Sequence, residues 1–291
     1  MLLSERTHQC ILGLIHIVSA ALFTPVLARM VYILIINKEF YKYECYRIIA
    51  QQLSLHVICG LCYIFYGVGI LLDNELWILV KSAHFLCIDA FLAIVTMTLV
   101  LAINRFCLIC RYAVPNWFSP LLQLYTWVLF FVLNVTMFSP LTRINLRKDK
   151  YSISYDGSVW FSANFGIFRF YYCSVLSCFA LILYVLITAY VIYRKFLYRT
   201  TTTTKAERSI LIQAGLIFIF NFLTVIVYNF FYDLLVQTPW CKNLYALFQM
   251  AYFMYLPALI YLVFNRKLRT EVWPCGKLNK VMYIFVMSST K

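Results

Sequence analysis

Seven long apolar segments occupy most of this 291-residue chain and leave little sequence for a water-soluble domain. Each holds at least the roughly 20 residues that a helix needs to cross about 30 Å of hydrocarbon. None alternates with period two as a barrel strand would, so we expect helices, which satisfy their own backbone in lipid. The sequence therefore predicts an all-α, polytopic membrane protein, a single seven-helix bundle formed by residues 1–291. The predicted spans are residues 10–37, 48–72, 77–106, 121–140, 165–193, 209–235 and 244–264.

Lysine and arginine are distributed unevenly between the predicted connections, and cytoplasmic connections normally carry the excess. The richer set is Lys38, Lys42, Arg47, Arg105, Arg111, Arg194, Lys195, Arg199, Lys205, Arg208, Arg266, Lys267, Arg269, Lys277, Lys280 and Lys291. The poorer set is Arg6, Arg143, Arg147, Lys148, Lys150 and Lys242. We therefore expect the N-terminus outside and the C-terminus in the cytoplasm. The net charge of +14 then suits membrane lipids with anionic headgroups or an acidic partner, and does not indicate nucleic-acid binding.

The third predicted span contains three ionisable residues, Lys81, His84 and Asp89. An ionisable side chain at mid-bilayer costs at least about 2.5–3.5 kcal/mol on insertion scales, so each one needs a structural or functional reason. Asp89 lies about 18 Å from the start of its span at 1.5 Å per residue, near the middle of the bundle. It could contact a cationic ligand, pair with Lys81, or stay protonated against a neighbouring hydroxyl. Lys81 and His84 are near enough to the outer interface to snorkel toward it.

The connection between the fourth and fifth spans contains a sequence typical of a β-hairpin. Within Tyr151–Trp160, aromatic and aliphatic residues alternate with serine before an Asp-Gly pair. A two-stranded lid over the outer side would fit a receptor, and it would fit a purely structural flap equally well. Cys10 and Cys241 are the cysteines nearest the outer face, and the sequence leaves open whether they form a disulfide.

Polar residues and a proline gather at the predicted cytoplasmic ends of three spans. The third span ends Asn104-Arg105-Phe106, which places the Arg105 guanidinium at the inner interface. Glu207, at the start of the sixth span, is a candidate ion-pair partner for Arg105. Pro257 lies inside the seventh span, where a proline frees one carbonyl and leaves a kink.

From the end of the seventh span into residues 265–291, apolar residues recur every four positions among basic ones. The apolar stripe is Phe264, Leu268 and Val272, and Arg266, Lys267 and Arg269 lie between its members. This pattern predicts a short amphipathic helix on the inner leaflet.

Together, the Asn-Arg-Phe that closes the third span, the proline in the seventh and the basic helix after it resemble the rhodopsin-like G protein-coupled receptor plan. The closer similarity is to the nematode chemosensory serpentine receptors of the class T or class X group. It covers nearly all of the chain and is strongest from Ser209 to Arg269. The segments that carry it are Cys45–Ile48, Leu101–Arg105, Ile212–Gln213, Phe220–Asn221 and Leu256–Asn265.

The resemblance implies a receptor that binds an external small molecule and activates a heterotrimeric G protein. Arg105 would contact the Gα subunit or hold the inactive state, and an outward swing of the sixth span would open the inner side. The ligand-binding candidates are His84, Asp89, Phe168, Tyr228, Phe231, Tyr232, Gln249 and Tyr252. The candidates for coupling and switching are Asn104, Arg105, Glu207, Pro257, Tyr261 and Asn265.

The sequence departs from the receptor plan at three places. Asn104 replaces the acid that usually precedes the arginine, so any restraint on Arg105 must come from another residue, for which Glu207 is the candidate. Tyr261 lies four residues after Pro257 rather than three. The connection between the fourth and fifth spans has no cysteine, so the usual disulfide to the third span cannot form.

Other classes of seven-helix protein fit less well. A retinal protein needs a lysine in its last span, and residues 244–264 contain none. All histidines lie in the first 84 residues and at different depths, which argues against a membrane zinc enzyme. We expect no enzyme activity, cofactor or metal ion. A transporter or ligand-gated channel is the serious alternative, because Asp89, Lys81 and Arg169 could line a pathway.

Overall fold

The protein is helical apart from one short β-hairpin within the described residues. The structure, a computed structural model, describes residues 2–72, 77–147, 152–198, 205–227, 231 and 239–273. The elements before the hairpin are α1 (Leu2–Ile36), α2 (Lys38–Tyr41), α3 (Glu44–Leu72), α4 (Trp77–Cys110) and α5 (Phe118–Phe138). The hairpin consists of β1 (Ile144–Arg147) and β2 (Ser152–Tyr155). The later elements are α6 (Trp160–Tyr198), α7 (Lys205–Ile226), α9 (Pro239–Met250), the π-helix η2 (Ala251–Tyr255), α10 (Leu256–Phe264) and α11 (Arg266–Val272).

Five of the described helices are long and apolar enough to cross a membrane, with mean hydropathies from 1.7 to 2.6. They are Arg6–Ile36, Glu44–Leu72, Val80–Cys110, Phe118–Phe138 and Trp160–Arg194. The other two predicted spans contain shorter apolar helices, Gly215–Ile226 and Ala251–Phe264. Part of the predicted span 209–235, namely residues 228–230 and 232–235, lies outside the described residues. A helical, membrane-embedded protein is therefore confirmed, with five membrane-length helices.

Several helices extend beyond the apolar segments that predict them. The first begins at Leu2 rather than at residue 10, and α4 continues to Cys110 rather than 106. The 39 residues of α6 would measure roughly 58 Å, well beyond the apolar thickness of a bilayer. Apolar composition locates the part of a helix that lies in lipid, but the helix itself continues wherever the backbone hydrogen bonds can continue.

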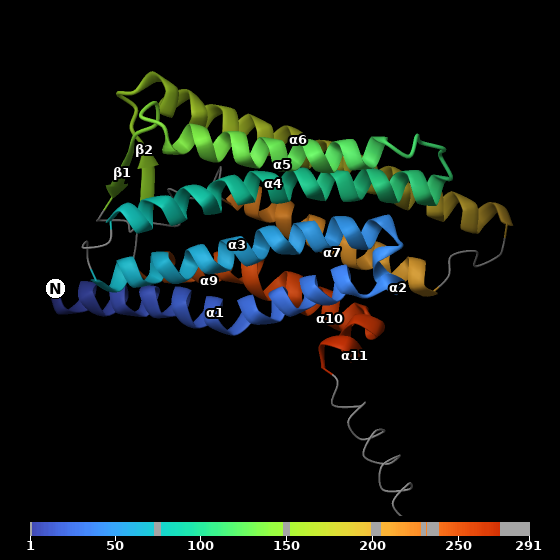
Figure 1. Ribbon diagram of the computed structural model, residues 1–291, viewed down its shortest axis with the longest axis horizontal. Helices are drawn as coiled ribbons and strands as arrows, with labels where there is room; N and C mark the ends of the chain where they lie inside the picture. Colours follow the sequence, from blue (N-terminus) through green and yellow to red (C-terminus); the bar gives the residue numbers. More distant parts are fainter. Residues whose placement is uncertain are drawn as a thin grey trace, which may run out of the picture.

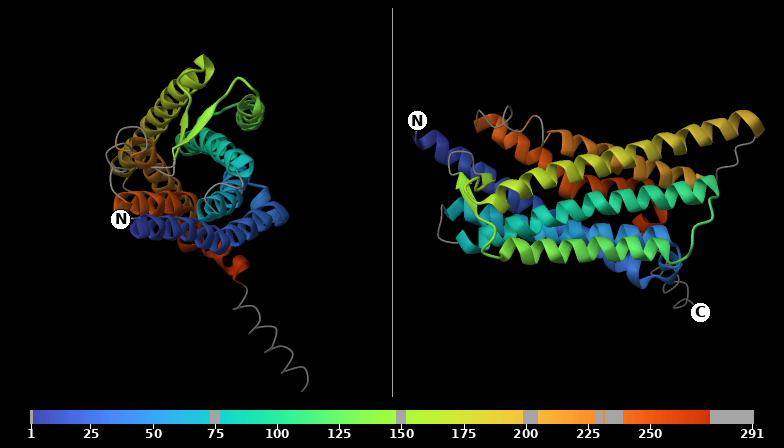
Figure 2. Two further views of the ribbon diagram at one scale, coloured as in Figure 1. Left: turned by 90° about the vertical axis from the view of Figure 1, so that its left-hand side faces the viewer. Right: turned by 90° about the horizontal axis from the view of Figure 1, so that it is seen from above.

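The long helices run alongside one another and give the molecule two distinct ends (Figure 1). The N-terminal end of α1 lies near the hairpin, at what we call the hairpin end. The opposite end carries α2 and α11, and we call it the α11 end. Viewed along the helices, α4 passes through the interior, and its most apolar window is 72% buried (Figure 2). The corresponding window of α6 is only 22% buried, so most of that helix faces outward.

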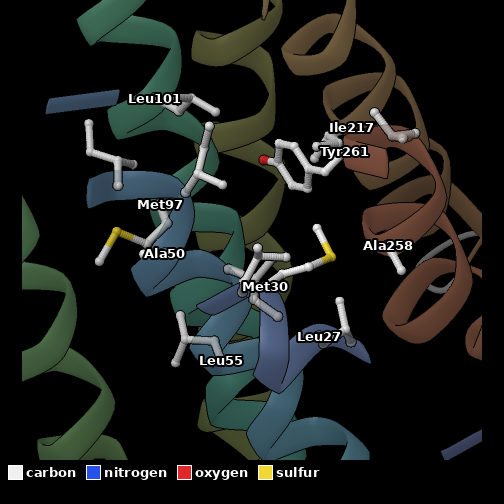
Figure 3. Packing of buried hydrophobic residues seen from close by; sticks show 14 of the residues in the cluster. Leu27, Met30, Ala50, Leu55, Met97, Leu101, Ile217, Ala258 and Tyr261 are labelled. Atoms are coloured by element: carbon white, nitrogen blue, oxygen red, sulfur yellow. The ribbon is translucent and has the colours of Figure 1, made fainter. Parts of the chain in front are cut away.

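The core is built mainly from α1, α3 and α4, with α10 closing one side. Leu27 and Met30 of α1 pack with Leu55 of α3 and Met97 of α4, and all four side chains are fully buried (Figure 3). Large apolar side chains also cover the outside of the helices. Since lipid is as apolar as the core, such residues need no partner in the protein.

The predicted hairpin is present, but its turn differs from the expected one. In the antiparallel pair, Ile144 lies opposite Tyr155 and Arg147 lies opposite Ser152, so the strands connect through residues 148–151, outside the described residues. The Asp-Gly pair follows the second strand instead. The Asp156 carboxylate accepts hydrogen bonds from the backbone N–H and hydroxyl of Ser158 at 2.9 and 2.7 Å. These bonds hold the pKa of Asp156 below its ordinary value.

The helix that contains Pro257 is continuous from α9 through η2 into α10. The π-turn lies immediately before the proline, and the Leu256 N–H donates to the carbonyl of Ala251, five residues back. A π-turn is a common way for a helix to accommodate a local irregularity. At the position of the predicted kink, the helix therefore changes its hydrogen-bond register.

The helix predicted after the seventh span is α11, but its apolar stripe packs against protein. Leu268 and Val272 are 0% and 2% exposed and belong to the same buried cluster as Phe40 of α2, whereas Phe264 is partly exposed. The expectation that this stripe lies on the leaflet is therefore wrong for Leu268 and Val272. The apolar pattern is confirmed, and α11 packs mainly against α1 and α10.

Polar contacts hold α11 in this place. The Lys267 ammonium forms an ion pair with the Glu39 carboxylate of α2. The side-chain oxygen of Asn265 accepts from the Leu268 N–H at 3.0 Å and caps the first turn of α11. Nη1 of Arg269 donates to the carbonyls of Leu262 and Val263 at 3.2 and 3.1 Å, so it satisfies acceptors at the end of α10.

Candidate functional site

The Arg105 side chain lies inside the bundle near the α11 end. It is 3% exposed, and its Nε and Nη2 atoms have no hydrogen-bond partner among the described residues. A buried guanidinium without partners is costly, because its charge has left water without compensation. Nε and one Nη of a guanidinium form the two-pronged donor that binds a carboxylate or phosphate side-on. Within the described residues, this donor pair of Arg105 is unoccupied.

Two buried tyrosines stand close to Arg105 and also have hydroxyls without a hydrogen-bond partner in the described part of the chain. They are Tyr184 of α6 and Tyr261 of α10, and both interact electrostatically with Arg105. The Tyr261 hydroxyl points from α10 toward the side of the bundle that carries Leu101 of α4 (Figure 3). Three helices thus bring one cation and two hydroxyls together.

The residue before Arg105 makes a contact that the sequence did not predict. Asn104 donates from Nδ2 to a carboxylate oxygen of Glu44, at the start of α3, over 2.7 Å. Glu207, the predicted partner of Arg105, belongs to α7, but its side chain lies outside the described part of the structure. The Asn104 bond ties α4 to α3 directly beside the arginine.

Asn265 and Tyr46 connect the same region to α11. Asn265 donates from Nδ2 to the Tyr46 hydroxyl at 3.3 Å, while its oxygen caps α11. Tyr46 of α3 also interacts electrostatically with Arg105. Asn265 therefore links α3, α10 and α11 at the edge of the Arg105 site, which we define as Arg105, Tyr184 and Tyr261.

A second buried cluster, which we call the polar hub, crosses the middle of the bundle. Thr98 of α4 accepts hydrogen bonds from the amide nitrogens of Gln52 (α3) and Asn221 (α7), at 3.1 and 3.0 Å. Tyr252 of η2 donates to Oδ1 of Asn221 at 2.9 Å. All four side chains are buried. Tyr252, predicted as a ligand contact, is a member of this hub.

Toward the hairpin end, Asp89 is fully buried, and neither carboxylate oxygen has a hydrogen-bond partner among the described residues. Arg169 of α6 interacts electrostatically with both Asp89 and His84. The Arg169 guanidinium also lies 5.4 Å from the centre of the Tyr155 ring of β2. Arg169 thereby relates the hairpin to the two predicted ligand-binding residues on α4. Lys81 lies over the Phe85 ring at 5.6 Å, and within the described residues it forms no ion pair with Asp89.

The other predicted ligand contacts are less closely grouped. Phe168 and Phe231 are 43% and 47% exposed. Tyr228 and Tyr232 lie outside the described residues, and Gln249 belongs to α9 with its side chain outside the described part. Among the predicted residues, the structure therefore brings His84 and Asp89 together near Arg169.

Cysteines and potential metal ligands form no further site in the described residues. No disulfide joins Cys10 to Cys241, a pairing that the sequence left open. No group of three or more histidine, cysteine, aspartate or glutamate side chains in the described part of the chain could hold a metal ion.

Comparison with known proteins assigns no family. No family model matches the sequence, and no curated protein matches it. The long apolar helices and the buried polar clusters define an integral membrane protein of the helical class.

Several important residues escaped the sequence analysis, namely Gln52, His56, Thr98 and Tyr184. All four are polar side chains within predicted spans, where a polar group normally requires a partner. That rule would have selected them had it been applied to uncharged residues as well as to charged ones. It would not have identified their partners, which lie on other helices.

Proposed function

We propose that the protein is a seven-transmembrane receptor that binds an external small molecule and activates a heterotrimeric G protein. The observation that carries this proposal is the Arg105 site. A buried guanidinium with two donor atoms that have no partner among the described residues, beside two tyrosine hydroxyls on other helices, is suited to receive an acidic group from a partner. Such a site lies where the sequence resemblance expects contact with Gα.

Seven spans are compatible with the described helices. In addition to the five membrane-length helices, α7 has 22 residues, and α9, η2 and α10 have 12, 5 and 9 residues in one continuous helix. Both α7 and the continuous helix from α9 to α10 therefore reach the roughly 20 residues that a span needs. The chain would then cross the membrane an odd number of times.

The charge distribution supports an orientation with the α11 end in the cytoplasm. Among the described residues, that end carries Lys38, Lys42, Arg47, Arg266, Lys267 and Arg269. The positive-inside rule then places the Arg105 site on the cytoplasmic side and the hairpin outside, in a plasma or ciliary membrane.

For ligand binding, His84 and Asp89 are the favoured contacts. A buried carboxylate without hydrogen-bond partners would gain most from a ligand that carries a donor or a positive charge. A ligand that bound more tightly to the conformation with an open Arg105 site would shift the population toward it, by no more than its difference in affinity. The helix expected to move is α7, as in the family that the sequence resembles.

Basal nucleotide exchange by purified Gα subunits tests the proposal without knowledge of the ligand. The wild-type protein in lipid nanodiscs is compared with Arg105→Ala, and Arg111→Gln serves as the control because Arg111 is exposed. We expect Arg105→Ala to abolish receptor-dependent exchange with surface expression intact, and Arg111→Gln to retain it. Unchanged exchange in Arg105→Ala would refute the assignment.

The alternative, a transporter or ligand-gated channel, predicts a different result. Ligand-dependent current or uptake in vesicles that contain no G protein would establish it. A screen of soluble odorants and pheromone-like molecules with a Gα-coupled reporter, run beside the Arg105 variant, would supply the ligand for both assays.

A further inference from the structure

Pro257 leaves one backbone carbonyl without its usual partner. In an α-helix the N–H of a residue donates to the carbonyl four residues earlier, and proline has no N–H. Counted four residues back from Pro257, that carbonyl belongs to Phe253 in the middle of η2, and counted five back, in the register of the Leu256 bond, it belongs to Tyr252. An unsatisfied carbonyl is costly in the interior of a membrane protein, so a replacement donor is required.

His56 of α3 supplies this donor. Its Nδ1 atom lies 3.1 Å from the Phe253 carbonyl oxygen, although 197 positions separate the two residues. Because a carbonyl can only accept, Nδ1 must carry the proton. The imidazole is 1% exposed, and its ring lies edge-on to the Tyr252 and Phe253 rings at 6.0 and 6.3 Å.

The rest of η2 is held in the same way by other helices. The Tyr252 hydroxyl donates to Asn221 of α7, Thr24 of α1 donates to the Met254 sulfur at 3.8 Å, and the Tyr255 hydroxyl bonds to Ser19 of α1. Four consecutive residues therefore have partners on three different helices. We call η2 together with these four partners the joint. Within the joint, the His56 hydrogen bond is the one that replaces a missing backbone hydrogen bond.

We propose that His56 is a positioning residue that fixes the register of this joint and, through it, the position of α10. Tyr261 of the Arg105 site lies on α10, about two helical turns beyond Phe253. Without the His56 donor, the Phe253 carbonyl must find another partner, and the start of α10 moves. The structural part of the inference is independent of the proposed function. Its consequence for signalling rests on that function.

Two pairs of isotope labels allow NMR to observe the joint in the whole protein. Phe253-Met254 is the sole Phe-Met sequence in the chain, and Pro257-Ala258 is the sole Pro-Ala sequence. Protein labelled with ¹³C′-Phe and ¹⁵N-Met therefore gives one carbonyl-to-nitrogen correlation, which reports the Phe253 carbonyl. A second sample with ¹³C′-Pro and ¹⁵N-Ala reports the start of α10.

The variants His56→Asn and His56→Gln form a matched pair. Both are polar amides, but asparagine can place its N–H near the position of Nδ1, whereas glutamine reaches the position of Nε2. We expect His56→Asn to keep the wild-type carbonyl shift of Phe253, and His56→Gln to move it upfield as the hydrogen bond is lost. The Pro257-Ala258 correlation is expected to move with it in His56→Gln alone. A third variant, His56→Leu, should behave as His56→Gln.

Two outcomes would overturn the inference. One is a Phe253 carbonyl shift that is the same in the asparagine and glutamine variants. The other is a shifted carbonyl with an unmoved Pro257-Ala258 correlation, which would show that the bond does not position α10.

Basal Gα nucleotide exchange, measured on the same samples, separates this inference from the proposed function. We expect exchange to change roughly tenfold in His56→Gln, the equivalent of one neutral hydrogen bond, and to stay at the wild-type rate in His56→Asn. Shifted correlations with unchanged exchange would support the role of His56 and count against the proposed function.

Discussion

The Tyr252 hydroxyl and the Asn221 side-chain oxygen lie 2.9 Å apart and join η2 to α7 in the middle of the bundle. The Asn221 amide in turn donates to Thr98 of α4, which also accepts from Gln52 of α3. Polar groups on four elements thus bond to one another inside the bundle, and the Gln52 side-chain oxygen is left without a partner among the described residues. Interhelical bonds of this kind stabilise membrane proteins modestly, but they are specific in geometry.

Tyr252→Phe tests the strength of this contact. The variant keeps the ring and leaves the Asn221 oxygen without its donor, so we expect a loss of about 0.6–1.7 kcal/mol in stability. Thermal unfolding in a single detergent measures it. Tyr171→Phe is the control, because Tyr171 is 61% exposed on α6. Equal unfolding temperatures for the two variants would contradict the prediction.

Leu268→Ala tests whether α11 is held by protein contacts. Leu268 is fully buried, and replacing a buried leucine by alanine typically costs about 2–5 kcal/mol. We expect the amides of α11 to lose hydrogen-exchange protection. Leu259→Ala, at a half-exposed position on α10, should leave that protection unchanged. Full protection of α11 in Leu268→Ala would mean that lipid, not protein, supports this helix.

The ion pair between Glu39 and Lys267 predicts a pH dependence for the docking of α11. The hydrogen bond and charge of Lys267 hold the pKa of Glu39 below its ordinary value, and the bond to Glu39 raises the pKa of Lys267. The contribution of Glu39 is therefore present above the ordinary carboxyl pKa and lost as the pH falls through the folded-state value. That of Lys267 is lost only when the pH rises through its raised value.

Between these limits both groups are charged, so the contribution of this pair to the protection of α11 should not change with pH. Hydrogen exchange measured from neutral to acidic pH should show weaker protection at the acidic end, by a small amount because both groups are exposed. Glu39→Gln should remove this part of the pH dependence. An identical pH profile in wild type and variant would exclude a role for the pair.

Asn104 and Glu44 allow a double-mutant cycle beside Arg105. Asn104→Asp replaces the donor with a second carboxylate 2.7 Å from the first, so we expect a loss of about 1–3 kcal/mol in stability. When Glu44→Gln is added, the glutamine amide can donate to the aspartate carboxylate at position 104. Most of the lost stability should then be recovered. Unfolding by denaturant gives the coupling energy. Additive effects of the two substitutions would show that the contact is not formed.

Helix positions could be predicted from the sequence because long apolar runs have few structural solutions in lipid. The surroundings of α11 could not. A stripe such as Leu268 and Val272 has the same sequence pattern whether it faces lipid or protein, and only the packing of α11 against α1 and α10 decides between the two. The hairpin was predicted, but its turn was placed at Asp156, which lies after the second strand.

The candidate site was predicted in part. The position of Arg105 followed from the end of its span, and burial of the side chain is now evident. The role of Tyr184 could not be predicted, because in a chain that is 19% aromatic one tyrosine within a span is not distinguished from the others. The partner of the Phe253 carbonyl could not be found either. Proline chemistry identifies which carbonyl is free, but the donor comes from α3 and depends on the packing of the whole bundle.

Arg269 gives the corner between α10 and α11 a mechanical property. Its guanidinium spans the corner and binds two carbonyls of the preceding helix, while Asn265 caps the following one. A corner that is held by hydrogen bonds on both sides resists bending, so α10 and α11 should move together as one rigid body. Any displacement that begins inside the membrane at α10 would then be carried to the surface as a swing of α11, with no separate hinge between them.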